Sequence, residues 1–176
     1  RIDADQALRS GCPSPELVAL RARLYFSEGD YLNSIRYFSR LIHSPDYGPE
    51  ALGTIGMCYA IMGYPSVAVS YYDEALAMGP ENSRLHGEKA DALTLLGRVD
   101  ESIEHYRQCI AMDPDNLSAM NNYGYALVLA GRLDEALELF DKMNSRNPTA
   151  FSLCNILEIS LMQEEWRKAA AFGDMC

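Results

Sequence analysis

The sequence contains few of the residues that build metal or redox sites. It has five cysteines in 176 residues, widely spaced and without a C-x-x-C pair. An odd number of unclustered cysteines builds neither a disulfide framework nor a zinc site, and this pattern is typical of a reducing compartment. We therefore predict a cytoplasmic protein, which a partner could still bring to a membrane surface. The cysteines are Cys12, Cys58, Cys109, Cys154 and Cys176, of which the middle three stand at apolar positions.

Histidine is scarce as well. His43, His86 and His105 are far apart, and the chain has no His-x-x-x-His or Glu-x-x-His pair and no glycine-rich phosphate loop. Acidic residues do cluster, at Asp100-Glu101 and Asp134-Glu135, and such clusters can hold a metal or act as general acids. A helix dipole and a solvated outer face explain carboxylates at helix starts more simply. We predict no catalytic residue, no metal and no cofactor, and hence no enzymatic activity.

Basic residues are in the minority. Fifteen Lys and Arg residues stand against twenty-five Asp and Glu residues, which gives a formal net charge of -10. A strongly acidic protein is repelled by the phosphates of nucleic acids and by anionic lipid surfaces. The charge balance therefore disfavours nucleic acid and favours a protein or peptide partner, preferably a basic one.

One uncharged run, residues 51–72, is long enough at 22 residues to cross a bilayer. Gly53, Gly56, Gly63 and Pro65 interrupt it, and Gly63 belongs to a pattern that recurs along the chain. We therefore predict no direct membrane insertion.

The chain does have an internal repeat. Residues 121–148 contain two runs in which apolar residues recur at three- and four-residue spacing, as in amphipathic helices, with Gly131 between the runs and Pro148 after them. The same features recur every 34 residues. This period relates the glycines Gly29, Gly63, Gly97 and Gly131, the prolines Pro80, Pro114 and Pro148, and the aromatic residues Phe38, Tyr72, Tyr106 and Phe140.

A 34-residue period of helix, turn, helix and proline resembles the tetratricopeptide repeat (TPR). The resemblance implies an all-α, right-handed superhelical solenoid of about five stacked antiparallel helix-turn-helix hairpins. On this interpretation the array is truncated at both ends. The expected units are the second helix of a preceding partial repeat at 1–14, four repeats at 15–48, 49–82, 83–116 and 117–150, and a partial fifth repeat at 151–176.

Three details of the repeats are less regular. We expect the second helix of the first repeat to run through Ile42, although its proline has moved to Pro45. In the second repeat we expect the small residues Gly56 and Ala68 to face each other, because small residues allow two helices to approach closely. In the fifth repeat Glu158 stands where the pattern has glycine, which leaves the register of that hairpin open.

The geometry of the family implies a concave groove lined by the first helix of each hairpin. Co-chaperones of the family hold a terminal carboxylate there with Lys, Asn and Arg, whereas the matching positions here hold residues such as Gly87, Glu88 and Asp91, and only Asn122 fits. Without paired cations we expect no carboxylate clamp. The predicted peptide-binding residues are Arg23, Met57, Arg84, Asp91, Asn121, Asn122, Tyr125, Leu129 and Ile159.

We expect a non-enzymatic protein–protein interaction scaffold that binds a peptide or helix of a partner in this groove. Tyr125 is the strongest candidate contact, because tyrosine combines a large apolar ring with a polar tip, and the alternative is that it packs on the adjacent hairpin. Two further functions stay open. One is a homo-oligomeric scaffold that self-associates through exposed terminal repeats, as on organelles such as magnetosomes; the other is a chaperone or adaptor for a secretion or assembly system.

Overall fold

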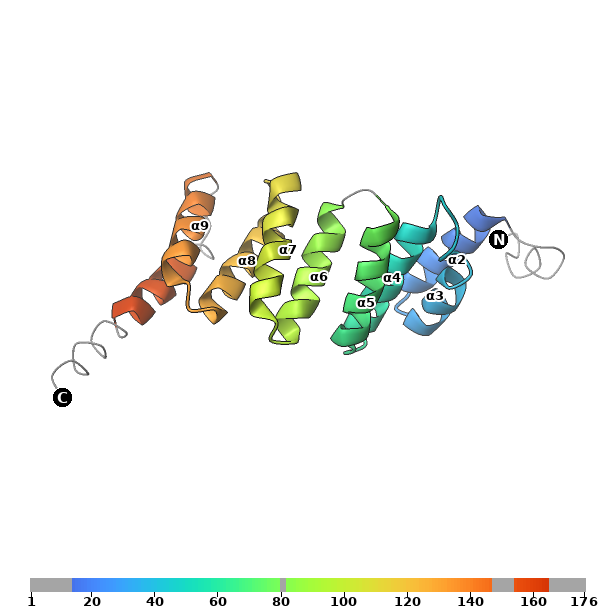
Figure 1. The fold of residues 1–176 in the computed structure, drawn as a ribbon, viewed down its shortest axis with the longest axis horizontal. Coiled ribbons are helices and arrows are strands. Elements are labelled where there is room, and N and C mark those ends of the chain that lie inside the picture. The colour runs from blue at the N-terminus through green and yellow to red at the C-terminus, as the bar shows by residue number, and fades with distance from the viewer. Residues whose placement is uncertain (1–13, 80–81, 147–153, 165–176) are drawn as a thin grey trace.

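The computed structural model describes residues 14–79, 82–146 and 154–164, and all regular secondary structure in these ranges is helical. The helices form antiparallel pairs that stand side by side along the long axis of the molecule (Figure 1). The all-α solenoid of stacked hairpins is thereby confirmed, while Pro148 and nearly all of the expected unit 1–14 lie outside the described residues. The pairs are α2 (Pro15–Ser27) with α3 (Tyr31–Phe38), α4 (Gly48–Ile61) with α5 (Pro65–Met78), α6 (Ser83–Leu95) with α7 (Val99–Met112), and α8 (Leu117–Leu129) with α9 (Leu133–Arg146), followed by the helical residues 154–164.

A glycine in the left-handed region follows the first helix of each pair. These glycines have φ between 72° and 84°, which residues with a Cβ rarely adopt. The residue after each glycine donates its N–H to the carbonyl five residues earlier, as Arg98 does to Leu93 at 2.9 Å. This bond satisfies a carbonyl that the end of the helix would otherwise leave without a partner. The glycines are the periodic ones: Gly29, Gly63, Gly97 and Gly131.

Polar side chains cap the other ends of several first helices. Ser14, Asn82 and Asn116 precede α2, α6 and α8, and each side-chain oxygen accepts a hydrogen bond from a backbone N–H of the first turn. For Asn116 the distance to the N atom of Ala119 is 3.0 Å. Pro15 begins α2, where the missing N–H loses no helical hydrogen bond. The starts of these helices are therefore encoded locally.

The two helices of a pair approach most closely where a small residue faces an aromatic ring. A Cβ built on Gly124 of α8 would lie 2.3 Å from Cζ of Phe140 on α9, and one on Gly56 of α4 would lie 2.7 Å from Cε1 of Tyr72 on α5. Both rings are almost completely buried. The ring of Tyr72 supplies the nearest atoms to Gly56, and the expected contact of Gly56 with Ala68 stays a prediction.

Successive pairs stack on one another. The second helix of one pair packs on the first helix of the next, and α4, α6 and α8 also contact one another in that order. Because these first helices follow one another directly, they form one continuous side of the stack. That side carries the candidate site.

The uncharged run 51–72 is accounted for by this packing. It covers most of α4 and the first half of α5, where Leu52, Ile55, Ala68 and Tyr72 are buried in the core. None of the described helices has both the length and the apolar character needed to span a bilayer.

Helix α3 is shorter than predicted. It ends at Phe38 instead of running through Ile42. Beyond Phe38 the chain continues in turns with hydrogen bonds three residues apart, such as Leu41 N to Phe38 O, and Ser39 Oγ donates to the carbonyl of Ile35 at 2.7 Å. A serine hydroxyl that competes for helix carbonyls and tighter three-residue turns both favour helix termination.

The contact between Gly124 and Phe140 gives a test of the packing. Gly124→Ala should lower the free energy of unfolding by about 1 to 3 kcal/mol, because the added methyl group overlaps a buried ring that has no room to move. Gly87→Ala is the matched control in α6, since its Cβ would lie 3.3 Å from Cys109 Sγ. The gain in helix propensity should leave that variant about as stable as the wild type. Urea unfolding followed by circular dichroism measures both, and equal stability of the two variants would contradict the packing described.

Candidate functional site

Three clefts follow one another along the side formed by the first helices, and together they are called the groove below. The N-terminal cleft, of about 290 Å³, lies among α2, α4 and α6; the central cleft, of about 150 Å³, lies between α6 and α8 above α7; the C-terminal cleft, of about 360 Å³, lies between α8 and residues 154–164. Each predicted binding residue lines at least one cleft. Arg23, Met57 and Arg84 line the N-terminal cleft, Arg84, Asp91 and Asn122 line the central cleft, and Asn121, Asn122, Tyr125, Leu129 and Ile159 line the C-terminal cleft.

Both arginines of the N-terminal cleft are engaged by neighbouring helices of the protein. Arg23 Nε and Nη2 donate to the two carboxylate oxygens of Glu50, each at 2.6 Å, and these bonds raise the pKa of Arg23. Arg84 Nη1 lies 3.1 Å from Met57 Sδ and 3.1 Å from Glu88 Oε1. The two arginines of this cleft therefore already interact with side chains of the protein itself.

Asp91 organises the central cleft. Its Oδ1 accepts hydrogen bonds from the hydroxyl of Tyr106 at 2.5 Å and from Nδ2 of Asn122 at 2.8 Å. Burial, with the negative charge of Asp91 added, raises the pKa of Tyr106, so the hydroxyl remains a donor at neutral pH. The carboxylate of Asp91 thus joins α6 to α7 and α8 and fixes the amide of Asn122 within the groove.

Glu88 is the most deeply buried acid of the groove. Burial is the main cause that raises its pKa to about 7; Asp91 adds to the shift and Arg84 opposes it. Oε1 accepts a hydrogen bond from Arg84, and Oε2 is buried; the hydroxyl of Tyr72 on α5 faces the carboxyl group as a donor and opposes the rise of its pKa. Burial of a carboxylate is energetically costly, so the central cleft holds an acid whose ionised form a bound positive charge would stabilise.

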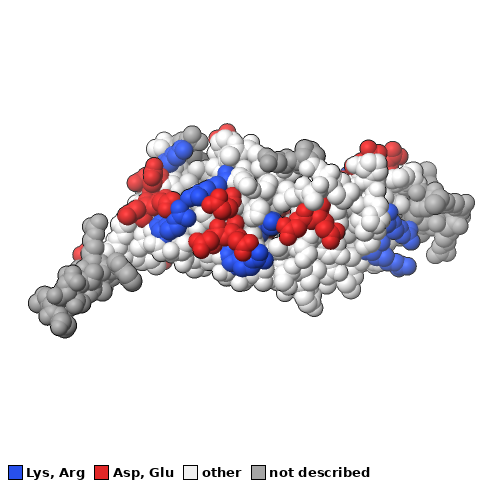
Figure 2. Space-filling view, viewed as in Figure 1, with Lys and Arg blue, Asp and Glu red and all other residues white. Residues whose placement is uncertain are grey.

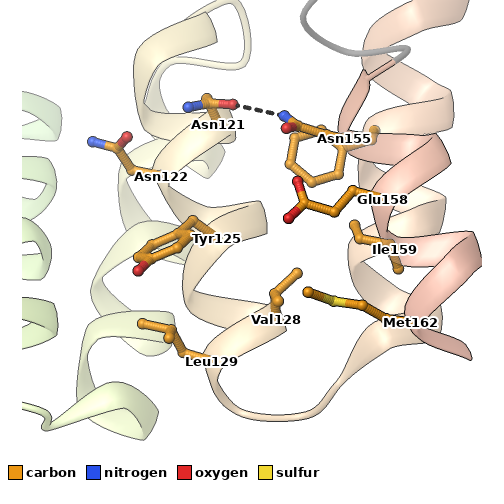
Figure 3. Close-up of a pocket in the computed structure, with 10 residues that line it drawn as sticks. Asn121, Asn122, Tyr125, Val128, Leu129, Asn155, Glu158, Ile159 and Met162 are labelled. Atoms are coloured by element: carbon orange, nitrogen blue, oxygen red, sulfur yellow. Dashed lines mark hydrogen bonds between the residues drawn. The ribbon is translucent and has the colours of Figure 1, made fainter. Parts of the chain in front are cut away.

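The C-terminal cleft is largely apolar. Tyr125, Val128 and Leu129 of α8 lie opposite Ile159 and Met162 of the helical segment 154–164 (Figure 3). The side chain of Tyr125 is 58% exposed, so packing on the adjacent hairpin does not bury it. Ile159 is only 3% exposed and forms the floor of the cleft rather than a freely accessible contact.

Two amides bridge the two helices of this cleft. Asn155 Nδ2 donates to Asn121 Oδ1 at 3.3 Å, as the dashed line in Figure 3 shows. Their residue numbers differ by 34, so the same repeat position supplies both partners. One of the predicted binding amides therefore has an internal partner, which holds the two sides of the cleft together.

The sequence pattern left open the register of the last described helix. Glu158 stands at the repeat position of Gly124 but is exposed and lines the C-terminal cleft, while Ile159, at the position of Tyr125, is buried. The buried position has moved by one residue. The sequence signals an altered register here through Glu158 at a glycine position, Glu165 at the position of the turn glycine, and Trp166, which suggests a shift of one residue; the last two lie outside the described residues.

Charged residues on the second helices form a mixed surface. Figure 2 shows acidic and basic side chains gathered together over α7 and α9 rather than in a patch of one sign. The acidic runs that open these helices are exposed, and they take part in ion pairs with nearby arginines. Ion pairs at 2.6 to 2.7 Å on and just before these helices are Arg98–Glu101, Arg107–Glu104 and Arg132–Glu135.

Two histidines that are distant in sequence meet between α6 and α7. The Nδ1 atoms of His86 and His105 are 2.9 Å apart, and the rings stack with centroids separated by 5.1 Å. Burial, with Lys89 and His86 adding to it, lowers the pKa of His105 to about 4. Within the described ranges no group of three or more His, Cys, Asp or Glu side chains is arranged to hold a metal.

The periodicity and the hairpins agree with a known family. A family model described as tetratricopeptide repeat matches residues 62–116 and 96–150, which together span just over half of the chain. The chain belongs to the tetratricopeptide repeat family. Proteins of the TPR family are generally protein–protein interaction scaffolds. No curated protein matches the sequence.

Several solved TPR structures share the fold. The crystal structure of YrrB, described as a TPR protein with an unusual peptide-binding site, has a TM-score of 0.79 at 18% identity, over 92% of this chain and 84% of that one. MamA from Desulfovibrio magneticus RS-1 has a TM-score of 0.78 at 18% identity, over 89% of each chain. The first TPR of Spaghetti (RPAP3), bound to the HSP90 peptide SRMEEVD, has a TM-score of 0.63 at 18% identity, over 66% of this chain and 93% of that one. At such identity the similarity establishes the fold alone.

The raised pKa of Glu88 predicts a pH-dependent stability. Its folded-state pKa of about 7 lies above the ordinary glutamate pKa of 4.5, so the folded state favours the protonated form. The contribution of protonated Glu88 to the free energy of unfolding is fully present below pH 4.5 and is lost as the pH rises through 7. Glu88→Gln keeps an acceptor for Arg84 and removes the ionisation, so the variant should be more stable than the wild type at pH 8 by about 1 to 3 kcal/mol, and equally stable near pH 4.5.

Urea unfolding of both proteins between pH 4.5 and 8 measures this difference. Glu138→Gln removes the same charge from the exposed side of α9 and should follow the wild type across the range. A constant difference between Glu88→Gln and the wild type at every pH would show that burial does not perturb Glu88 in this way.

Proposed function

We propose that this TPR protein is a non-enzymatic scaffold that binds a segment of a partner protein in its groove. The C-terminal cleft carries the proposal, because its volume of about 360 Å³ is combined with an apolar lining and an exposed tyrosine at its edge. Pockets of this size and character are typical of ligand sites, and tyrosine is typical of binding hot spots. The groove contains carboxylates and amides, and the role proposed for them is recognition rather than chemistry.

A row of exposed apolar side chains marks the ends of three first helices. Ile61, Leu95 and Leu129 occupy the same repeat position at the ends of α4, α6 and α8, and they are 54%, 72% and 49% exposed. Three such side chains at one repeat position cannot serve the core, since they are open to solvent. A partner segment with apolar side chains would cover them, which supports an amphipathic helix or an extended segment as the bound form.

An acidic C-terminal peptide of the kind bound by RPAP3 does not suit this groove. The peptide SRMEEVD carries three acidic side chains near its end. In the groove described here, Arg23 is hydrogen-bonded to Glu50, and Arg84 is hydrogen-bonded to Glu88. No pair of cations in the groove therefore remains to bind a carboxylate in bidentate fashion. The expectation that this chain lacks a carboxylate clamp therefore gains support from the contacts themselves.

The other two functions stay predictions. Leu157 and Leu161 are exposed on the helical segment 154–164, which is compatible with self-association, but an apolar pair alone does not select a second copy of the chain. A role as a chaperone or adaptor would use the same groove, so it is a special case of the proposal.

Replacing Tyr125 tests the proposal. The probe is the tightest-binding peptide selected from a randomised dodecapeptide library displayed on phage, then synthesised with a fluorescent label. Tyr125→Ala should weaken its binding about tenfold or more, because truncating an aromatic hot spot typically costs upward of 1 kcal/mol. Fluorescence anisotropy measures the Kd, and circular dichroism checks that the fold is retained.

Tyr64→Ala is the matched control. Tyr64 is exposed to a similar extent, 54%, but it lies at the turn before α5 and lines none of the three clefts. Its loss should leave the Kd unchanged. A library that yields no binding peptide, or a Tyr125→Ala variant that binds as tightly as the wild type, would overturn the groove as the binding site.

A further inference from the structure

We propose that the bound segment carries a lysine or arginine side chain that binds Glu88 and Asp91 in the central cleft, beside an apolar side chain in the C-terminal cleft. This inference rests on the proposed function and specifies the chemistry of the partner. It identifies the occupant as a basic and apolar segment of another protein.

Charge complementarity within the central cleft supports the basic residue. Glu88 and Asp91 contribute two carboxyl groups to its lining, and Arg84 contributes the one cation. When both acids are ionised the cleft keeps one uncompensated negative charge. The nearest lysine on α6, Lys89, is directed elsewhere, because its Nζ pairs with Asp73 on α5 at 2.5 Å.

Hydrogen bonding also supports a basic side chain as the occupant of the central cleft. The Glu88 carboxyl group accepts from Arg84 and Tyr72, and Asp91 Oδ1 accepts from Tyr106 and Asn122, so both acids face the cleft region as acceptors. Guanidinium and ammonium groups carry only donors, so either suits a cleft lined by two acceptor groups and would compensate the charge at once. The cleft volume of about 150 Å³ is roughly five times the ~30 Å³ occupied by one water molecule, which leaves room for such a head group.

A divalent cation fits the same cleft less well. Asp91 Oδ1 already accepts hydrogen bonds from Tyr106 and Asn122, and the guanidinium of Arg84 lies 3.1 Å from Glu88 Oε1. A divalent ion would be repelled by that guanidinium at close range. A single positive charge with several donors suits the cleft better.

The central and C-terminal clefts are contiguous, so the basic and the apolar side chain of the partner should lie close together. Asn122 lines both the central and the C-terminal cleft. Its Nδ2 is held by Asp91, so its side chain forms the boundary between an acidic and an apolar compartment. A segment that fills both should therefore carry its basic and apolar side chains only a few residues apart.

Binding of a cation should also depend on pH. The groups around Glu88 are Arg84 and Asp91 on α6, Tyr72 from α5 and Tyr106 from α7; α8 contributes the uncharged Asn122. Burial raises the pKa of both tyrosines, so they stay neutral near pH 7. Ionisation of Glu88, whose pKa is about 7, then strengthens the attraction for a basic side chain as the pH rises from 6 to 8.

The phage-displayed dodecapeptide library provides the test. Peptides selected on the wild-type protein should be enriched in Lys or Arg a few residues from a large apolar residue. For a synthesised peptide of this kind, Glu88→Gln should weaken binding about tenfold, and so should replacing the basic residue of the peptide by Gln. The two changes together should weaken binding little more than either alone, because both remove the same contact.

Two further measurements sharpen the result. The affinity of the wild type for this peptide should increase from pH 6 to pH 8, whereas that of Glu88→Gln should change much less. Glu138→Gln, which removes an equal charge from the outer side of α9, should bind the peptide as the wild type does.

The outcomes separate the two proposals. Selected peptides without an excess of Lys or Arg, or equal loss of affinity with Glu138→Gln and Glu88→Gln, would overturn the basic contact while leaving groove binding intact. A Mg²⁺ or Ca²⁺ titration that raises the melting temperature of the wild type but not of Glu88→Gln would assign the cleft to a metal instead. Absence of any selected peptide would overturn the proposed function and this inference together.

Discussion

The whole stack depends on the close approach of the two helices within each hairpin. A small residue on the first helix lies under an aromatic ring of the second, as Gly124 lies under Phe140 and Gly56 under Tyr72. Neither helix alone could bury the ring, and a larger residue at the glycine would displace it. Because this contact sets the distance and orientation of the two helices, the side chains on the outer side of the first helices are presented at a regular spacing.

On one side of the first helices the residue types repeat from pair to pair, and on the other side they vary. The positions that contact the second helix hold similar residues in every pair, since the packing problem is the same each time. The groove positions differ instead. One repeat position holds a cation, a thioether, a carboxylate, a phenol and an aliphatic group in succession: Arg23, Met57, Asp91, Tyr125 and Ile159. Recognition can therefore vary along the groove without any change in the scaffold.

The fold could be predicted from the sequence because its signals are local and periodic. The turn at Gly97 and the cap at Asn116 each act within a few residues, so spacing alone locates them. The end of α3 and the rotation that exposes Glu158 were not predictable in this way, since they depend on competing hydrogen bonds and on neighbouring helices. In the site, the pattern placed side chains on the groove but could not show that Arg23 is neutralised by a partner 27 residues away.

The acidity of the central cleft follows from the same aromatic packing that holds the hairpins together. Tyr106 fills the space between α6 and α7 with its ring, and its hydroxyl emerges at the groove to bond Asp91. Burial beside the core raises the pKa of Glu88, which is therefore kept near the point of ionisation at neutral pH. The scaffold thus fixes one carboxylate in place and buries the other, so a basic partner would supply a positive charge that stabilises the ionised form of the buried acid.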